Sequence, residues 1–129
     1  MGTYEEILET FKKKLKTVSV VEIADIPKID LYMDQVTTFM DQALTPYKRS
    51  SDGKVLTKTM INNYTKAKVL PPPVKKKYGR MHIMLLIMIF HLKTVLSIKD
   101  IATLFQPIFA LPTKEESEKQ TEKIYAGFI

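Results

Sequence analysis

The sequence lacks cysteine altogether and contains little glycine. Without cysteine, disulfide scaffolds, thiolate zinc sites and thiol redox chemistry are all excluded, which fits a reducing cytoplasm. The four glycines form no phosphate-binding loop. The unbroken apolar run at residues 83–90 is eight residues long, whereas a membrane-spanning helix needs about twenty. We therefore expect a cytoplasmic protein that has no membrane partner.

The chain is also poor in groups that perform catalysis or bind metals. Its two histidines, His82 and His91, are nine residues apart, so they point to opposite sides of a helix and cannot share a metal ion. Asp30, Asp34 and Asp41 would share one helix face, but an exposed stripe explains them more simply than a metal site. We expect no enzymatic activity, no metal and no cofactor.

Positive charge is concentrated in one segment of the chain. From Lys48 to Arg80 there are ten basic residues and one acid, a net charge of +9, whereas the rest of the chain has a net charge of −3. The total of +6 therefore comes from this segment alone. A cationic face of this kind is typical of proteins that bind nucleic acid, because contact with phosphates releases counterions.

The apolar periodicity and the capping residues predict an all-α, mainly helical fold in one domain of 129 residues. We expect Asp30 to cap the second helix, Thr57 the third, and Ser97 the fifth, which should end before Pro107. The fourth helix is apolar on nearly every side and should form the hub of the core. The expected helices cover residues 3–16, 31–45, 58–68, 80–94 and 98–106, and a sixth starts after Thr113.

A small basic hairpin is expected between the third and fourth helices. Pro71, Pro72 and Pro73 cannot continue a helix, because proline has no backbone donor. A run of lysines at residues 75–77 follows them directly. The pattern therefore predicts a turn or wing at residues 74–80.

The sixth helix lacks an apolar face over most of its length. Residues 114–123 include no apolar side chain. A dimerisation helix or truncated tail is one explanation, and a frayed, solvated terminus is the other.

The segments that carry a family resemblance are residues 29–36, 56–64, 69–73, 77–80, 92–93 and 96–101. In this order they resemble the winged helix-turn-helix of the mercury-resistance-regulator (MerR) family. The closer resemblance, which includes residues 29–36 and 60–82, is to a bacterial family of domains of unknown function that is distantly related to MerR regulators. The resemblance implies a MerR-like winged-helix domain at residues 20–106. The residue pattern adds an N-terminal amphipathic helix at residues 1–19 and a C-terminal helix at residues 107–129.

The resemblance implies that the third helix (residues 57–68) reads DNA and that the basic hairpin (residues 74–80) is the wing. Side-chain amides can pair with adenine edges, and lysines add affinity without sequence choice. The residues that would approach the major groove are Thr57, Lys58, Thr59, Asn62, Asn63, Tyr64 and Lys66. The residues that would contact phosphates are Lys75, Lys76, Lys77, Tyr78 and Arg80.

Two functions of different class follow from the sequence. The first is a bacterial transcriptional regulator that binds double-stranded DNA. Such a regulator could act as a homodimer, and the sequence does not identify a small-molecule effector for it. The second is a non-catalytic helical protein-interaction module that uses the basic face for an acidic protein partner. The long loop at residues 46–55, which carries Lys48, Arg49 and Lys54, is not explained by the resemblance.

Overall fold

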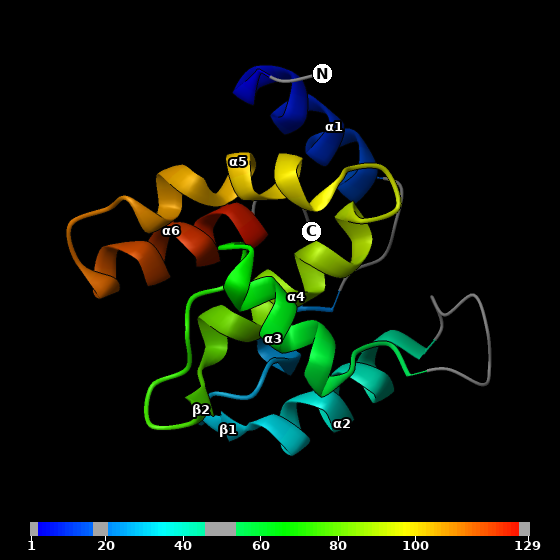
Figure 1. The fold of residues 1–129 in the computed structure, drawn as a ribbon, viewed down its shortest axis with the longest axis vertical. Coiled ribbons are helices and arrows are strands. Elements are labelled where there is room, and N and C mark those ends of the chain that lie inside the picture. Colours follow the sequence, from blue (N-terminus) through cyan, green and yellow to red (C-terminus); the bar gives the residue numbers. More distant parts are fainter. Residues whose placement is uncertain (1–2, 17–20, 46–53, 127–129) are drawn as a thin grey trace.

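The computed structural model describes residues 3–16, 21–45 and 54–126 (Figure 1). It is mainly helical, as the sequence predicts, and the described residues include one small two-stranded sheet. In Figure 1, α2 and both strands lie on one side of the central helix α4, α3 crosses in front of it, and α1, α5 and α6 lie on the other side. In chain order the elements are α1 (Tyr4–Lys16), the 3-10 helix η1 (Ile23–Asp25), β1 (Leu31–Tyr32), α2 (Met33–Leu44), α3 (Lys58–Lys66), β2 (Lys77–Tyr78), α4 (Arg80–Leu92), α5 (Ile98–Phe109) and α6 (Lys114–Ala126).

α4 forms the hub of the core. Eleven of its thirteen residues are buried, and a helix that is apolar all round must be enclosed by other elements. Helices α1 and α6 and strand β2 contact it directly. Met40 of α2 and Ile61 of α3 are fully buried in the same core. The predicted role of α4 as the hub of the core is confirmed. Despite its apolar sequence, neither α4 nor any other helix among the described residues is long and apolar enough to cross a membrane.

Short polar side chains begin four of the helices. At α1, the hydroxyl of Thr3 accepts from the backbone N–H of Glu6 at 3.1 Å. The hydroxyl of Thr57 accepts a hydrogen bond from the backbone of the first turn of α3 at 3.1 Å. Ser97 does the same for α5 at 3.1 Å. At α6, Thr113 accepts from the backbone N–H of Glu116 and donates to the Glu116 carboxylate, both at 3.1 Å. These caps satisfy backbone donors that a helix start otherwise leaves unpaired, and those of α3, α5 and α6 are predicted from the sequence.

α2 begins later than the sequence predicts. The expected cap, Asp30, precedes the helix, and Tyr32 stands at the cap position. The reason is a long-range pairing: β1 lies antiparallel to β2, with Leu31 opposite Tyr78, and this pairing keeps the chain extended through Tyr32. The backbone N–H of Tyr32 then donates to the side chain of Gln35 at 2.8 Å.

α5 continues through Pro107 to Phe109, so the prediction that it ends before the proline is wrong. Proline lacks an N–H group and costs a helix interior about 3 kcal/mol. Leu104, Phe105 and Ile108 of this helix are buried, and burial of one such side chain contributes about 1.5–3 kcal/mol. The apolar stripe continues past the proline, and its burial outweighs the lost hydrogen bond.

α6 packs against α4 and α5 of its own chain. Its buried face consists of Ser117, Thr121 and Tyr125. Ser117 donates to the carbonyl of Ile108 at 2.9 Å, and Tyr125 donates to the carbonyl of Val21. Small hydroxyl side chains let the helix approach closely while their polar atoms are satisfied. A frayed, solvated terminus is therefore not what the described residues show, and this face is already occupied within the chain.

If α6 is part of the core, replacing Tyr125 should destabilise the protein strongly. We expect Tyr125→Ala to lower the free energy of unfolding by about 3–5 kcal/mol, because it removes a large buried side chain. Tyr125→Phe should cost about 1 kcal/mol, since only the hydroxyl bond is lost. Urea unfolding measures both. Lys123→Ala, at an exposed position of the same helix, is the control; equal effects of Tyr125→Ala and Lys123→Ala would contradict the packing of α6.

Candidate functional site

α3 presents one polar face to solvent. Ile61 and Tyr64 are buried and attach the helix to the core. Lys66 stands in its last turn, where a cation suits the negative end of the helix dipole. Six of the residues that the resemblance implicates lie on the exposed part of this segment: Thr57, Lys58, Thr59, Asn62, Asn63 and Lys66.

Tyr64 is placed differently from those six. Only 6% of its surface is exposed, and its hydroxyl accepts a hydrogen bond from the ammonium group of Lys93 at 3.0 Å. The same ammonium lies 5.4 Å from the centre of the tyrosine ring, within the range of a cation–π contact. Sequence reasoning missed Lys93, because it follows α4 and nothing in the local pattern links it to α3.

The lysine hairpin, defined here as residues 74–78, has an unusual turn. Val74 and Lys77 exchange two backbone hydrogen bonds, both of 3.0 Å, which leaves Lys75 and Lys76 as a two-residue loop. Both have positive φ angles, 52° and 66°, as a type I′ turn requires. Asparagine and glycine are the usual residues there, because other side chains are strained in this conformation. Both lysines are exposed at this strained turn.

Strand pairing attaches the lysine hairpin to the start of α2. Tyr32, the cap residue of that helix, pairs with Lys77 in the sheet. The ammonium of Lys77 lies 5.3 Å from the centre of the Tyr32 ring. The hairpin is thus held at the end where α2 begins, although the two segments are distant in the sequence.

Tyr78 and Arg80, the last two residues that the resemblance implicates, are engaged in the fold. Tyr78 is 2% exposed, and burial raises the pKa of its phenol. The guanidinium of Arg80 donates to the carbonyl of Ile23 at 2.7 Å, which ties η1 to the first turn of α4. The structure therefore brings nine of the twelve implicated residues to the surface and uses Tyr64, Tyr78 and Arg80 for internal contacts.

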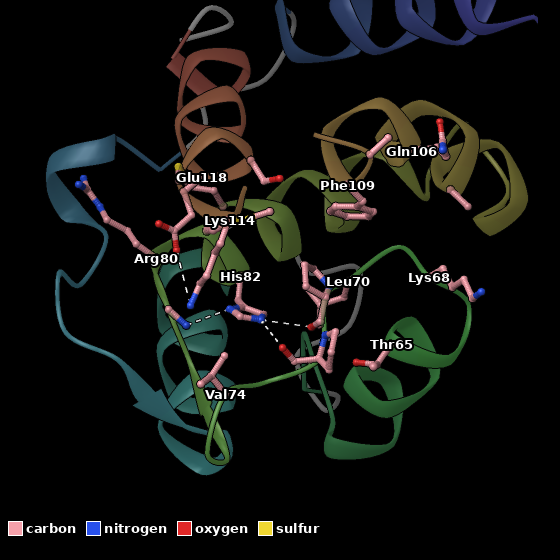
Figure 2. A pocket seen from close by; sticks show the side chains of 18 of the residues that line it. Thr65, Lys68, Leu70, Val74, Arg80, His82, Gln106, Phe109, Lys114 and Glu118 are labelled. Carbon is pink, nitrogen blue, oxygen red and sulfur yellow. Dashed lines mark hydrogen bonds and ion pairs between the residues drawn. The ribbon is translucent and has the colours of Figure 1, made fainter. Parts of the chain in front are cut away.

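His82 joins the proline segment to the start of α4. Its Nδ1 accepts from the backbone N–H of Gly79 at 3.0 Å. Its Nε2 lies 3.2 Å from the carbonyl oxygens of both Pro71 and Pro72, so Nε2 carries the proton (Figure 2). This set of partners fits the neutral imidazole, because protonated Nδ1 would face the Gly79 N–H donor. The sequence indicates only that His82 and His91 cannot share a metal ion, and it does not reveal these contacts.

The pKa of His82 is lowered, mainly because burial penalises the charged ring. The positive charge of Lys114 acts in the same direction, whereas the two proline carbonyls and Asp30 oppose it. No group of three or more histidine, aspartate or glutamate residues within the described segments could hold a metal ion.

A large groove opens beside this histidine (Figure 2). It is about 1540 Å³ in volume and lies between the segment that joins α3 to β2 and the helices α5 and α6. Pro71, Pro72 and Phe109 contribute apolar surface, and Lys68, Lys114 and Glu118 contribute charged groups. The sequence did not locate this groove, because its walls come from segments that are far apart in the chain.

A comparison with protein families matches residues 21–128 to the family described as "Domain of unknown function (DUF1836)". The chain belongs to this family. The expected membership in a family of domains of unknown function is thus confirmed. The DUF1836 match runs from before η1 through α6, so it takes in α3, the lysine hairpin and both sides of the groove. No curated protein and no solved structure matches the chain.

The buried, neutral state of His82 predicts a pH dependence of stability. Because its pKa is lowered from 6.5 in the folded DUF1836 domain, the unfolded chain binds the proton more tightly. The stabilising contribution is complete above about pH 6.5 and is lost below it, by up to about 1.4 kcal/mol per pH unit until the folded pKa is reached.

His82→Gln isolates this contribution, because glutamine can still donate to the proline carbonyls but does not titrate. At pH 8 the wild type should be more stable than the variant by about 1–3 kcal/mol, since Gly79 loses its acceptor. Urea unfolding at several pH values should show this difference shrinking as the pH falls towards 5. A constant difference would show that His82 is not the titrating group.

Proposed function

We propose that the protein binds double-stranded DNA through α3 and the lysine hairpin, as a transcriptional regulator with a MerR-like winged helix-turn-helix. The observation that carries this proposal is the turn of the hairpin, where Lys75 and Lys76 both have positive φ angles. A non-glycine residue in this conformation costs about 1–3 kcal/mol. Strain of this kind is concentrated at functional sites, where another requirement outweighs stability.

The requirement that fits best is positive charge at the tip of the hairpin. Lys75, Lys76 and Lys77 are all exposed, and a two-residue turn is the part of a hairpin that projects furthest. Lysine ammonium groups at such a tip can reach the phosphates of a duplex and release counterions. An acidic residue or asparagine would suit the backbone as well or better, but would not bind phosphate.

α3 supports the same proposal with a different chemistry. Asn62 and Asn63 expose amide groups, which can pair with the N6 and N7 atoms of adenine in the major groove. Lys58 and Lys66 are exposed near the two ends of the helix and can contact phosphates on either side. Only the short segment of residues 67–73 separates α3 from the hairpin, so one duplex could contact both. Lys48 and Arg49 of the long loop lie outside the described residues.

Replacing the strained lysines Lys75 and Lys76 should stabilise the fold but weaken DNA binding. We expect Lys75→Asn with Lys76→Gly to raise the free energy of unfolding by about 1–2 kcal/mol, because these residues favour the type I′ turn. The same change should weaken DNA binding, because two ammonium groups are lost. If the wild type neutralises about four to six phosphates, its log–log salt slope is about −4 to −5, and the variant should lose about 2 units of that slope.

Fluorescence anisotropy with a random duplex at several salt concentrations measures the affinity. Lys119→Gln with Lys123→Gln is the matched control, since it removes the same charge from exposed positions of α6. Equal loss of binding in both double variants would show that only the net charge matters and would contradict the proposed interface. No binding of the wild type, together with co-purification of an acidic protein, would favour the protein-interaction module instead.

The amides of α3 predict an effect on sequence choice. Selection from a random duplex pool should enrich an adenine-containing site for the wild type. Asn62→Ala with Asn63→Ala should reduce discrimination at those positions by about 1–3 kcal/mol per lost amide–adenine pair. Affinity for random duplex should change little, because no cation is removed. Gln120→Ala, at an exposed amide of α6, is the control; an unchanged selected site in the Asn62/Asn63 variant would contradict base reading by α3.

A further inference from the structure

The groove beside His82 combines an apolar middle with charged ends. In Figure 2, Leu70 and Phe109 lie in its middle, Lys68 lies at one end, and Lys114 and Glu118 lie at the other. At about 1540 Å³ it is larger than most small-molecule sites, which are about 300–1000 Å³. An elongated ligand would therefore fit along part of it.

The charges of the groove are unbalanced. Three acidic residues line it, Asp30, Glu118 and Glu122. Glu118 is already 4.0 Å from the ammonium of Lys114. Six basic residues line it: Lys28, Lys68, Lys77, Arg80, Lys99 and Lys114. The groove thus has a net charge of +3, which favours a negatively charged ligand.

Two of the six basic residues have no counter-charge of their own. Lys68 lies at one end of the groove (Figure 2), and Lys99 lines it from the first turn of α5. In the described part of the chain, neither Lys68 nor Lys99 takes part in a salt bridge. Both ammonium groups can therefore pair with an acid group of a ligand.

The backbone at Lys68 gives an independent reason to assign it a role. Its φ angle is 63°, and it follows the C-cap of α3, where Lys68 N–H donates to the carbonyl of Thr65 and Val69 N–H to that of Tyr64, both at 3.1 Å. Glycine is the usual residue at this position, because it has no strain there. As in the hairpin turn, a lysine stands where the backbone favours another residue.

We propose that the groove binds a free amphipathic carboxylate, an elongated apolar chain or ring system that ends in an acid group. The apolar part lies along Pro71, Pro72 and Phe109, and the carboxylate pairs with the ammonium group of Lys68 at one end of the groove. A neutral ligand would leave that ammonium group unpaired, and a cationic ligand would be repelled by it. This inference does not depend on DNA binding.

Titration of the full chain with decanoate, decanol and decylamine tests the proposal, with binding followed by isothermal calorimetry below the concentrations at which these compounds form micelles. Decanoate should bind at least about tenfold more tightly than the other two, since only it pairs with the cations. Equal binding of decanol or decylamine, or no binding of decanoate, would overturn the proposal.

Two variants place the ligand in the groove. Lys68→Gly should weaken decanoate binding about fivefold, as for loss of one exposed ion pair, while the urea midpoint rises or stays unchanged because the strain is relieved. Ala110→Trp, at an exposed position on the rim, should block binding without lowering that midpoint. Lys119→Gln, outside the groove, should leave binding unchanged. Undiminished binding in the first two variants, or equal loss in the third, would contradict the assigned site.

Discussion

The hydrogen bonds of one buried imidazole organise the region on which both proposed interactions depend. His82 binds the carbonyl oxygens of Pro71 and Pro72 on one side and the backbone N–H of Gly79 on the other. The chain between these contacts is the lysine hairpin, so the two ends of that hairpin meet at a single ring. Three prolines cannot supply backbone donors of their own, and the imidazole instead donates to two of their carbonyls. The same ring lines the groove, which links the hairpin and the groove to the start of α4.

Three lysines of this region occupy strained backbone positions. Lys68, Lys75 and Lys76 are the described non-glycine residues with positive φ angles, and no described glycine has one. A sequence optimised for folding alone would place glycine or asparagine at these positions. Three lysines there reduce the free energy of unfolding, and a fold with a well-buried central helix can tolerate that loss. Under both proposals a ligand interacts with the ammonium groups of these lysines, and that interaction offsets the conformational strain of their backbone.

Those features that depend on neighbouring residues were predictable from the sequence. Thr57 caps α3 because a hydroxyl before a helix accepts from its first turn, and α4 is buried because it is apolar on nearly every side. Features that depend on distant residues were not predictable. The pairing of Leu31 with Tyr78 moved the start of α2, and no local signal in either strand identifies its partner.

The same distinction explains the candidate site. Exposure of Lys75, Asn62 and their neighbours follows from the polar face of a helix and from a turn after prolines, both of which can be read locally. The internal roles of Tyr64 and Arg80 depend on Lys93 and on the carbonyl of Ile23, which lie far away in the sequence. α6 shows the limit most clearly, because small hydroxyl residues such as Ser117 and Thr121 are buried by the close approach of other helices. A pattern based on apolar residues cannot detect a face of this kind.

Under the two proposals, the basic segment that dominates the charge of the chain contributes to more than one surface. Within its described part, the exposed lysines of α3 and the hairpin lie on the proposed DNA face, whereas Lys68 lies at one end of the groove (Figure 2). Lys77 belongs to both, since it lies in the hairpin and also lines the groove. One continuous segment, residues 67–77, thus connects the proposed recognition helix, the hairpin and the groove wall. Both proposed surfaces therefore use side chains from one stretch of backbone, which His82 fixes to the start of α4 through Pro71, Pro72 and Gly79.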